Sequence, residues 1–553
     1  MAEAKTYKLK ADLEDKELVK EIKKAQTDAL SLFQSVMKRG DNNYTFWQRG
    51  TDEDLSQINP NKSKVVNNRI FTDVETSIPI LTANTPEPVI LNVNNTLREN
   101  YAELLQMSYE VHLKLKQKLQ RMARNWYSYY VGVIKYFWDV KLKRFDCEVI
   151  NPKKIFFDRT ATSPTNCEFV VEEIEEDVDI LNEKYPKGKL KEHYPDLKGK
   201  EKYWEVWFEY GKWCAWIIPS KSIFLEKMEN PNFDKNGNNL LSFNVPKFPF
   251  IFFNVFKNTD NNSLYDDTSL IEQCIPIQRD ISRIERQISD LTDGQKRVWT
   301  YDTSKLKEEK AQHLVDETGD MAIGIDGSLD GLDMKLGRPD ASMFNNLAHL
   351  LAEIDNIMGI HSTTRGERAQ QETLGGRQLL QSADYGRQDL IVNNIEQVSE
   401  ELYNAFFQLF LVYGTEPITF EDENRKITVD PLSIPRELLI MVKKGSTLPT
   451  DDKSRAENAL TLAQFGMIDP KTLFEELGYG NEDERVKNLY TWLIASGKLS
   501  PEAIQMIQQE GSPQNVNMQR MNELLSNPQI KNLPLEDQQS ILDQGREILS
   551  TIK

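Results

Sequence analysis

The 553-residue sequence has few of the residues, and none of the motifs, on which most catalytic sites depend. It holds four cysteines without a Cys-x-x-Cys pair and five scattered histidines, which argues against a zinc site, a disulfide framework and a histidine-centred catalytic site. No G-x-x-x-x-G-K-[ST] phosphate loop, G-x-S-x-G elbow or H-E-x-x-H motif is present. We therefore expect no catalytic residues, no metal, no cofactor and no ATP hydrolysis.

Long apolar runs are also missing. The longest strongly apolar stretch, 405–413, is too short to span a bilayer, and the polar first ten residues lack the apolar segment of a signal peptide. Hydrophobic residues at 39% and charged residues at 28% are ordinary for a soluble protein long enough for two to four domains. We expect a protein made in a cytosol.

The charge balance is strongly acidic, with 86 acidic against 68 basic side chains and a net charge of −18. Static binding of nucleic acid is disfavoured, because phosphate contacts are made largely by lysine and arginine. Two interpretations remain open. The charge suits a surface along which nucleic acid moves without sticking, and it also suits solubility alone.

A helical hairpin is the clearest pattern in the chain. Over 268–293, apolar residues recur on average every 3.5 positions, a spacing typical of a helix packed lengthwise on other helices, and a returning helix is expected at 341–358. Pro276 predicts a kink or a late start. Because the hairpin has little apolar surface of its own to cover this row, we expect neighbouring subunits to share it through Ile277, Ile281, Ile284 and Ile288.

The insert at 294–340 combines a strand-like stretch, 298–301, with a charged run and a turn-rich end. We expect it to project as a tip that docks partners. The residues expected to make this contact are Trp299, Lys305, Lys307 and Lys310.

The loop at 359–373 is polar and mixed in charge, although it lies between two strongly helical segments. Such a loop either faces a lumen or ligand or is an ordinary surface connection. On the first interpretation its functional residues are His361, Arg365, Glu367, Arg368 and Glu372. The two arginines would touch phosphates transiently, while the glutamates keep the local field near neutral.

The remaining chain predicts an α+β fold. We expect a helix over 14–39 that ends before Gly40, and one long helix from 96 to about 130. An antiparallel β-domain over 133–227, with a helix inserted near 177–185, follows. Strands at 416–442 are expected to return to that domain.

Three local patterns have competing interpretations. The acidic run at 172–179 resembles paired catalytic carboxylates, but its alternation with Val and Ile favours the exposed face of a strand leading into a helix. The aromatic cluster at 126–138 could stack bases, but its interleaved valines favour a core. Residues 232–237 resemble a calcium loop, but Phe243 stands where a ligating glutamate is needed, which favours a turn.

Several segments, taken in order, resemble a known family. They are the N-terminal helix leading into 68–73, the Pro152-to-Asp158 turn of the β-domain, the helix at 268–291, and 364–367 opening into 374–377. In this order they are similar to the portal proteins of tailed bacteriophages, over roughly 15–450. That family forms the ring at one capsid vertex through which DNA is packaged and ejected.

The resemblance implies a ring of twelve copies in the virion, assembled in the host cytoplasm, and no membrane. Implied partners are the large terminase subunit, the major capsid protein, a head–tail adaptor or tail proteins, and double-stranded DNA that passes non-specifically. The implied parts are a wing (1–267), stem helices (268–293 and 341–358), a clip (294–340), a channel loop (359–373), a long wing helix with returning strands (374–448) and a helical crown (449–553). A cytosolic coiled-coil scaffold without DNA contact and a nucleic-acid enzyme remain as alternatives.

Overall fold

The contacts of the chain divide it into two units, Met1–Leu448 and Pro449–Lys553. The computed structural model describes residues 7–59, 62–188, 190–258, 263–293, 298–305, 307, 309, 321–325, 339–361, 364–365, 374–422 and 425–444, with 459–463, 468–477, 485–486 and 488–489 of the second unit. Apart from the short helix α12 (Pro470–Glu476), the crown expected at 449–553 lies almost wholly outside the described residues.

The expected antiparallel β-domain is present as a five-stranded sheet. Its order follows the chain: β4 (Ile155–Phe157), β5 (Phe169–Asp177), β6 (Lys200–Phe208), β7 (Trp213–Ile218) and β8 (Ile223–Glu229). Each strand is antiparallel to its neighbours. The helix predicted near 177–185 is confirmed as α5 (Val178–Lys184), and a short α6 (Leu190–His193) follows.

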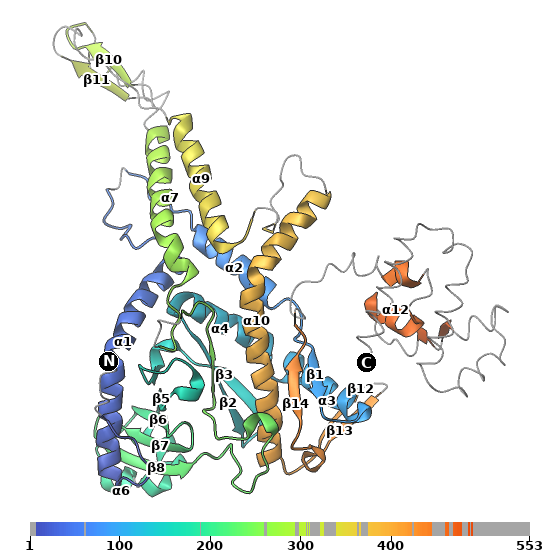
Figure 1. Cartoon of the computed structure of the whole chain (residues 1–553). Coiled ribbons are helices and arrows are strands. Elements are labelled where there is room, and N and C mark those ends of the chain that lie inside the picture. The colour runs from blue at the N-terminus through green and yellow to red at the C-terminus, as the bar shows by residue number, and fades with distance from the viewer. Residues whose placement is uncertain are drawn as a thin grey trace, which may run out of the picture. The chain divides into compact units, whose positions relative to one another are not determined.

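Helix α1 (Asp15–Arg49) covers one face of this sheet (Figure 1). Leu18, Ile22 and Ala25 are fully buried there against alternate residues of β5, β6 and β7 such as Val171 and Val206. The period of two in a strand places these residues on the α1 side and the residues between them on the opposite side.

A second, three-stranded sheet, in the order β3-β2-β9, lies on the opposite side. Its strands are β2 (Gly132–Asp139), β3 (Arg144–Val149) and β9 (Phe250–Phe253). Along β2, Val133 packs toward the five-stranded sheet, while Ile134 and Tyr136 pack in the large core that also contains α4 and α10. The aromatic cluster at 126–138 is mainly core, as predicted, since Trp126, Tyr127 and Tyr130 are buried.

Helix α1 is longer than predicted. It passes through Gly40 and ends at Gly50, whose φ of 68° suits a helix terminus. A Cβ built on Gly40 would lie 2.4 Å from Cδ1 of Tyr129. The glycine therefore permits close packing of α1 on α4 and does not terminate the helix.

The prediction of a single helix from 96 to about 130 was wrong. The chain forms α3 (Asn95–Met107), a π-helical turn (Ser108–His112) and α4 (Leu115–Tyr129). Lys114 separates them with a left-handed φ of 47°, which an uninterrupted helix does not contain.

The strands after the long helix α10 (Leu374–Tyr413) do not return to the β-domain, which corrects a second prediction. Strands β12 (Ile418–Asp422) and β13 (Arg425–Val429) pair with each other. Strand β14 (Leu439–Val442) pairs with β1 (Pro88–Leu91). The sheet of β1 and β14 packs on α10 and α3.

The predicted helical hairpin is formed by α7 (Leu270–Asp293) and α9 (Ala341–Met358), which lie side by side (Figure 1). Helix α7 contains Pro276 within its length. In the sequence between these two helices, strands β10 (Val298–Asp302) and β11 (Met321–Ile325) pair in parallel. Strand β10 confirms the strand predicted at 298–301.

Candidate functional site: the hairpin and the loop at its base

The N-terminal part of α7, residues 270–284, is called here the lower half of the helix. It belongs to the core of its own chain. Ile281 is fully buried and Ile284 nearly so, while Ile277 is half-buried against the same core. Helices α1, α2 (Arg69–Leu81), α4 and α9 all contact α7. The prediction that Ile281 and Ile284 are shared between subunits is therefore wrong. Helices distant in sequence cover the row that appeared unpartnered.

The upper half of the hairpin, residues 285–293 of α7 and 341–351 of α9, is less buried. Ile288 and Leu291 of α7 and Leu347 and Leu351 of α9 are only half-buried, and Phe344 is 50% exposed. Among the described residues, the two helices alone leave this apolar row partly open to solvent. Of the four stem residues named from the sequence, only Ile288 lies in this part.

The polar side of α7 is fastened to the segment between α1 and α2. Nη2 of Arg279 lies 2.7 Å from Asp52, and Arg286 pairs with Glu53. Ser63 donates its backbone N–H to Asp290 over 2.6 Å. These contacts run along most of α7 and hold its orientation relative to α1.

Arg365 is placed differently from the expectation. Its side chain is 5% exposed and forms ion pairs with Asp355 at 2.9 Å and Asp73 at 3.1 Å. Its Nη1 also donates to the Ile360 carbonyl. Arg69 binds the same Asp355 with Nε and Nη2. The guanidinium of Arg365 therefore closes a network joining α2, α9 and the loop, and does not present itself to a phosphate.

His361 also fastens the base of the loop. Its Nδ1 lies 2.5 Å from Asp384 of α10, and its Nε2 lies 3.2 Å from the side-chain oxygen of Asn356. Thr364 donates its hydroxyl to Asp384 as well. The ring is about one-third exposed. His361 therefore links α9 to α10 where the loop leaves the body.

Burial dominates the electrostatics of this network. It raises the pKa of Asp73 from 3.8 to about 7, against the lowering effect of Arg69, and the charge of Asp355 raises it further. One carboxylate oxygen of Asp73 is buried without a hydrogen-bond partner. An uncharged Asp73 fits that position, because a buried unpartnered charge is costly.

The other residues of the loop and clip are placed only in part. Glu367, Arg368, Glu372 and Lys310 lie outside the described residues. The backbone of Trp299 belongs to β10, and Lys305 and Lys307 are exposed.

A buried charge cluster between the two sheets was not predicted from the sequence. Lys135 of β2 lies 2.6 Å from Glu172 of β5 and 2.7 Å from Glu205 of β6. Trp207 and Trp216 donate their indole N–H groups to Glu205. The solvated-face interpretation of the acidic run is thus wrong at Glu172, which is buried. A lone lysine within the apolar strand 132–138 was the available signal.

The directions of the pKa shifts follow from these contacts. Burial would lower the pKa of Lys135, but Glu205 and Glu172 together raise it. Burial raises the pKa of Glu172. It has the same effect on Glu205, but Lys135 and the two indoles outweigh it and lower that pKa.

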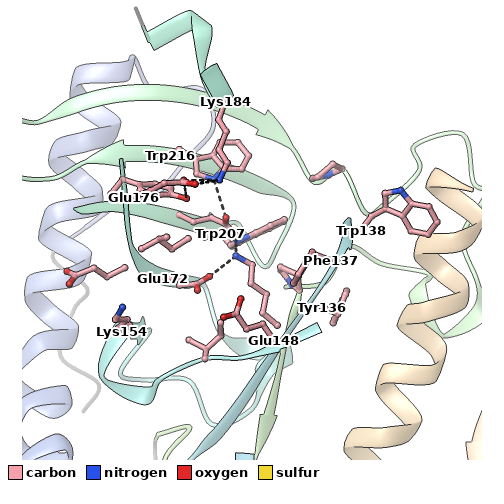
Figure 2. Close-up of a pocket in the computed structure, with 18 of the residues that line it drawn as sticks. Tyr136, Phe137, Trp138, Glu148, Lys154, Glu172, Glu176, Lys184, Trp207 and Trp216 are labelled. Carbon is pink, nitrogen blue, oxygen red and sulfur yellow. Dashed lines mark hydrogen bonds and ion pairs between the residues drawn. The ribbon is translucent and has the colours of Figure 1, made fainter. Parts of the chain in front are cut away.

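A cleft of about 670 Å³ opens beside this cluster (Figure 2). In this view Trp138 lies on the α10 side of the cleft, and Glu176, Lys184 and Trp216 lie on the other. Lys184 pairs with Glu176, as Lys135 pairs with Glu172. Both of these lysines are thus neutralised within the chain, although the cleft, with six glutamates and three lysines in its lining, is acidic.

Among the residues that the structure describes, no group of three or more His, Cys, Asp or Glu side chains could hold a metal ion. No helix in the described part of the chain is long and apolar enough to cross a membrane.

Solved structures similar to this chain include the two that follow. One is described as the neck of an empty gene transfer agent (GTA) particle, with a TM-score of 0.37 and 10% identity over 77% of this chain and 94% of that one. The other is the virion of a native gene transfer agent particle, with a TM-score of 0.35 and 10% identity over 75% and 90%. No family model and no curated protein matches the chain. At these scores the likeness carries no functional argument.

Proposed function

We propose that this chain is a subunit of a portal-like ring at one capsid vertex, a conduit for DNA and not an enzyme. The observation that carries the proposal is the hairpin of α7 and α9. Its lower half is packed in the body, and its upper half leaves Phe344 half-exposed beside Ile288, Leu291, Leu347 and Leu351. Copies placed side by side around a ring would cover this row.

The order of elements in the sequence supports the finer assignments. They are a ring of twelve, with the terminase motor, the major capsid protein and a head–tail adaptor or tail proteins as partners, in a virion assembled in the host cytoplasm. The absence of a phosphate loop is consistent with a motor on a separate protein. The acidic charge of the chain suits DNA that slides without being held.

The anchored base of the loop changes which residues are assigned to DNA. Because Arg365 and His361 bind Asp355, Asp73 and Asp384 within the chain, we assign them the role of holding the loop. The contact with passing phosphates then falls to Arg368, with Glu367 and Glu372 beside it. Arg368→Glu should leave rings assembled and change the length of DNA retained in particles; unchanged retention would remove Arg368 from the channel.

The clip is proposed to dock the motor or adaptor through Trp299, Lys305, Lys307 and Lys310. Deleting 294–340 and joining α7 to α9 by a short glycine linker should leave the ring intact and abolish partner binding. A deletion variant that fails to fold, as judged by loss of its circular-dichroism signal, would show that the insert belongs to the core.

The ring itself is tested by placing a charge on the upper hairpin. Phe344→Asp should dissociate the oligomer, because the contact between copies would bury an unpaired carboxylate at a cost of several kcal/mol. The fold of each subunit should survive, since Phe344 is already 50% exposed. Leu432→Asp, at a residue 93% exposed outside the hairpin, is the matched control. Mass measured by light scattering that is equal for both variants would contradict the assignment.

A further inference from the structure

Asp73 of α2 is a fully buried carboxyl group whose two oxygens have different surroundings. Its Oδ1 lies 3.1 Å from Nη1 of Arg365 and 3.6 Å from Nε of Arg69. Its Oδ2 has no hydrogen-bond partner in the described part of the chain. The charged form gains from the two guanidinium groups at Oδ1, whereas the protonated form avoids a bare charge at Oδ2. Because these effects oppose each other, a small change in the surroundings can shift the balance between the two forms.

The charged groups around Asp73 come from three elements. Arg69 lies on the same helix, Asp355 on α9 and Arg365 on the loop. When Asp73 is charged, two carboxylates balance two guanidinium groups. When it is protonated, one positive charge is left in excess inside the chain, which is costly. Helix α2 fixes the backbone of Arg69, whereas Arg365 belongs to the loop, so this cost acts mainly on the position of Arg365.

Other titratable groups on the elements around α2 do not compete with Asp73 for this role. Burial raises the pKa of Cys274 on α7, and the charge of Asp73 raises it further, so the thiol stays neutral. Burial raises the pKa of Tyr127 on α4 to about 12, so this side chain stays neutral as well. His361 contacts Asp384 of α10 and not Asp73. Its protonation would strengthen that contact in acid, because the hydrogen bond becomes one between charged groups.

We propose that Asp73 is a proton switch for the base of the loop: its charged form holds Arg365 in place, and its protonated form loosens that hold. Burial raises the pKa of Asp73 to about 7, while Arg365 acts to lower it. Departure of Arg365 must therefore raise this pKa, so the chain takes up a proton as Arg365 leaves. The hold on Arg365 strengthens as pH rises through about 7. This sign is opposite to the effect of Asp73 on complete unfolding, in which the buried carboxyl group reaches water and releases its proton.

The test is hydrogen–deuterium exchange of the purified full-length chain, read by mass spectrometry in peptides that contain Thr364 and Arg365. The backbone N–H groups of both residues donate to the His361 carbonyl, so their protection reports whether this turn is formed. Protection factors, corrected for the intrinsic effect of pH on exchange, should rise about threefold to tenfold between about pH 6 and about pH 8. Asp73→Asn should give the lower protection at both pH values, because the amide resembles the protonated acid.

Two control variants separate this switch from other titrations. His361→Gln removes the histidine, and the rise of protection with pH should persist in it. Asp280→Asn, at an exposed carboxylate of α7, should leave the rise unchanged.

Protection that stays constant or falls as pH rises would overturn the proposal, as would a full rise in Asp73→Asn or its loss in His361→Gln. If Asp73→Asn does not fold, the pH dependence of the unsubstituted chain and of His361→Gln decides alone. The measurement needs neither DNA nor partners, so its failure would leave the proposed ring untouched. Failure to form rings would likewise leave the switch standing.

Discussion

At the scale of single residues, the most consequential feature is the four-residue network of Arg69, Asp73, Asp355 and Arg365. Arg69 and Asp73 form a local i,i+4 pair on α2. No local pattern in the sequence could have paired them with Asp355 of α9 or with Arg365 of the loop. Helical periodicity reports which side of a helix is apolar, but it does not report which distant charge meets a given arginine. Arg365 was predicted to touch phosphates in a channel, whereas its side chain is 5% exposed within this network.

The first prediction concerns the strength of this network. Arg365→Met should lower the free energy of unfolding by roughly 3 kcal/mol, because it leaves Arg69 as the only one of the two arginines near the buried Asp355 and Asp73. Arg283→Met is the control, since Arg283 is 65% exposed and paired only with Asp280 on the same helix. The control should cost less than about 1 kcal/mol. Equal urea midpoints for the two variants would show that the network contributes little.

The second prediction concerns pH. Burial raises the pKa of Asp73 to about 7 in the folded chain, from 3.8. Between these values the folded chain holds a proton that the unfolded chain has lost, so this group makes the free energy of unfolding fall as pH rises. The slope is at most about 1.4 kcal/mol per pH unit.

Asp73→Asn should remove this contribution, because the amide resembles the protonated acid and does not titrate. Unfolding by urea at about pH 5 and about pH 7 gives the slope for each variant. Asp280→Asn, at a side chain 48% exposed, is the control. An Asp73→Asn slope identical to that of the unsubstituted chain would mean that Asp73 stays charged.

At the scale of elements, the long helices were predictable and their ends were not. The apolar rows of α7 and α9 and the strand-rich composition of 133–227 are local signals, and both were confirmed. Helix α1 continues through Gly40, where the glycine packs closely against Tyr129 of α4. Helices α3 and α4 are separated at Lys114 by a residue with left-handed backbone angles. Neither feature can be predicted from the helix propensities of single residues.

The prediction that the acidic run of β5 is an exposed face failed for a related reason. The alternation of acidic with apolar residues could not show that a second sheet covers the face of β5 with Glu172. A glutamate on a covered face requires a cation, and that cation, Lys135, is on another strand of another sheet. The buried cluster could only be found once both sheets were in place.

The third prediction tests the role of Gly40 as a packing residue. Gly40→Ala should lower the free energy of unfolding by about 1–3 kcal/mol, because the new methyl would lie 2.4 Å from Tyr129 Cδ1. Gly386→Ala in α10 is the matched control, because a Cβ there has nothing within 4 Å. The control should stabilise the chain by roughly 0.5–1 kcal/mol. If both alanines stabilised the chain, close packing of α1 on α4 would be refuted.

At the scale of the whole molecule, the central feature is an apolar row on the hairpin that the described residues of one copy leave partly exposed. Within the described residues, α1, α2 and α4 contact α7 where Ile281 and Ile284 are buried, whereas Phe344 stays 50% exposed. A subunit with net charge −18 also repels its own copies. Assembly should therefore depend on this apolar contact and improve as salt screens the repulsion.

The most direct measurement is an electron micrograph of the purified full-length chain, without partners, in moderate salt. The account predicts closed rings with a central opening, twelve copies in each, and their loss on Phe344→Asp but not on Leu432→Asp. A coiled-coil scaffold would give open or elongated assemblies. Monomers at high concentration, or rings that persist in the Phe344→Asp variant, would contradict the account.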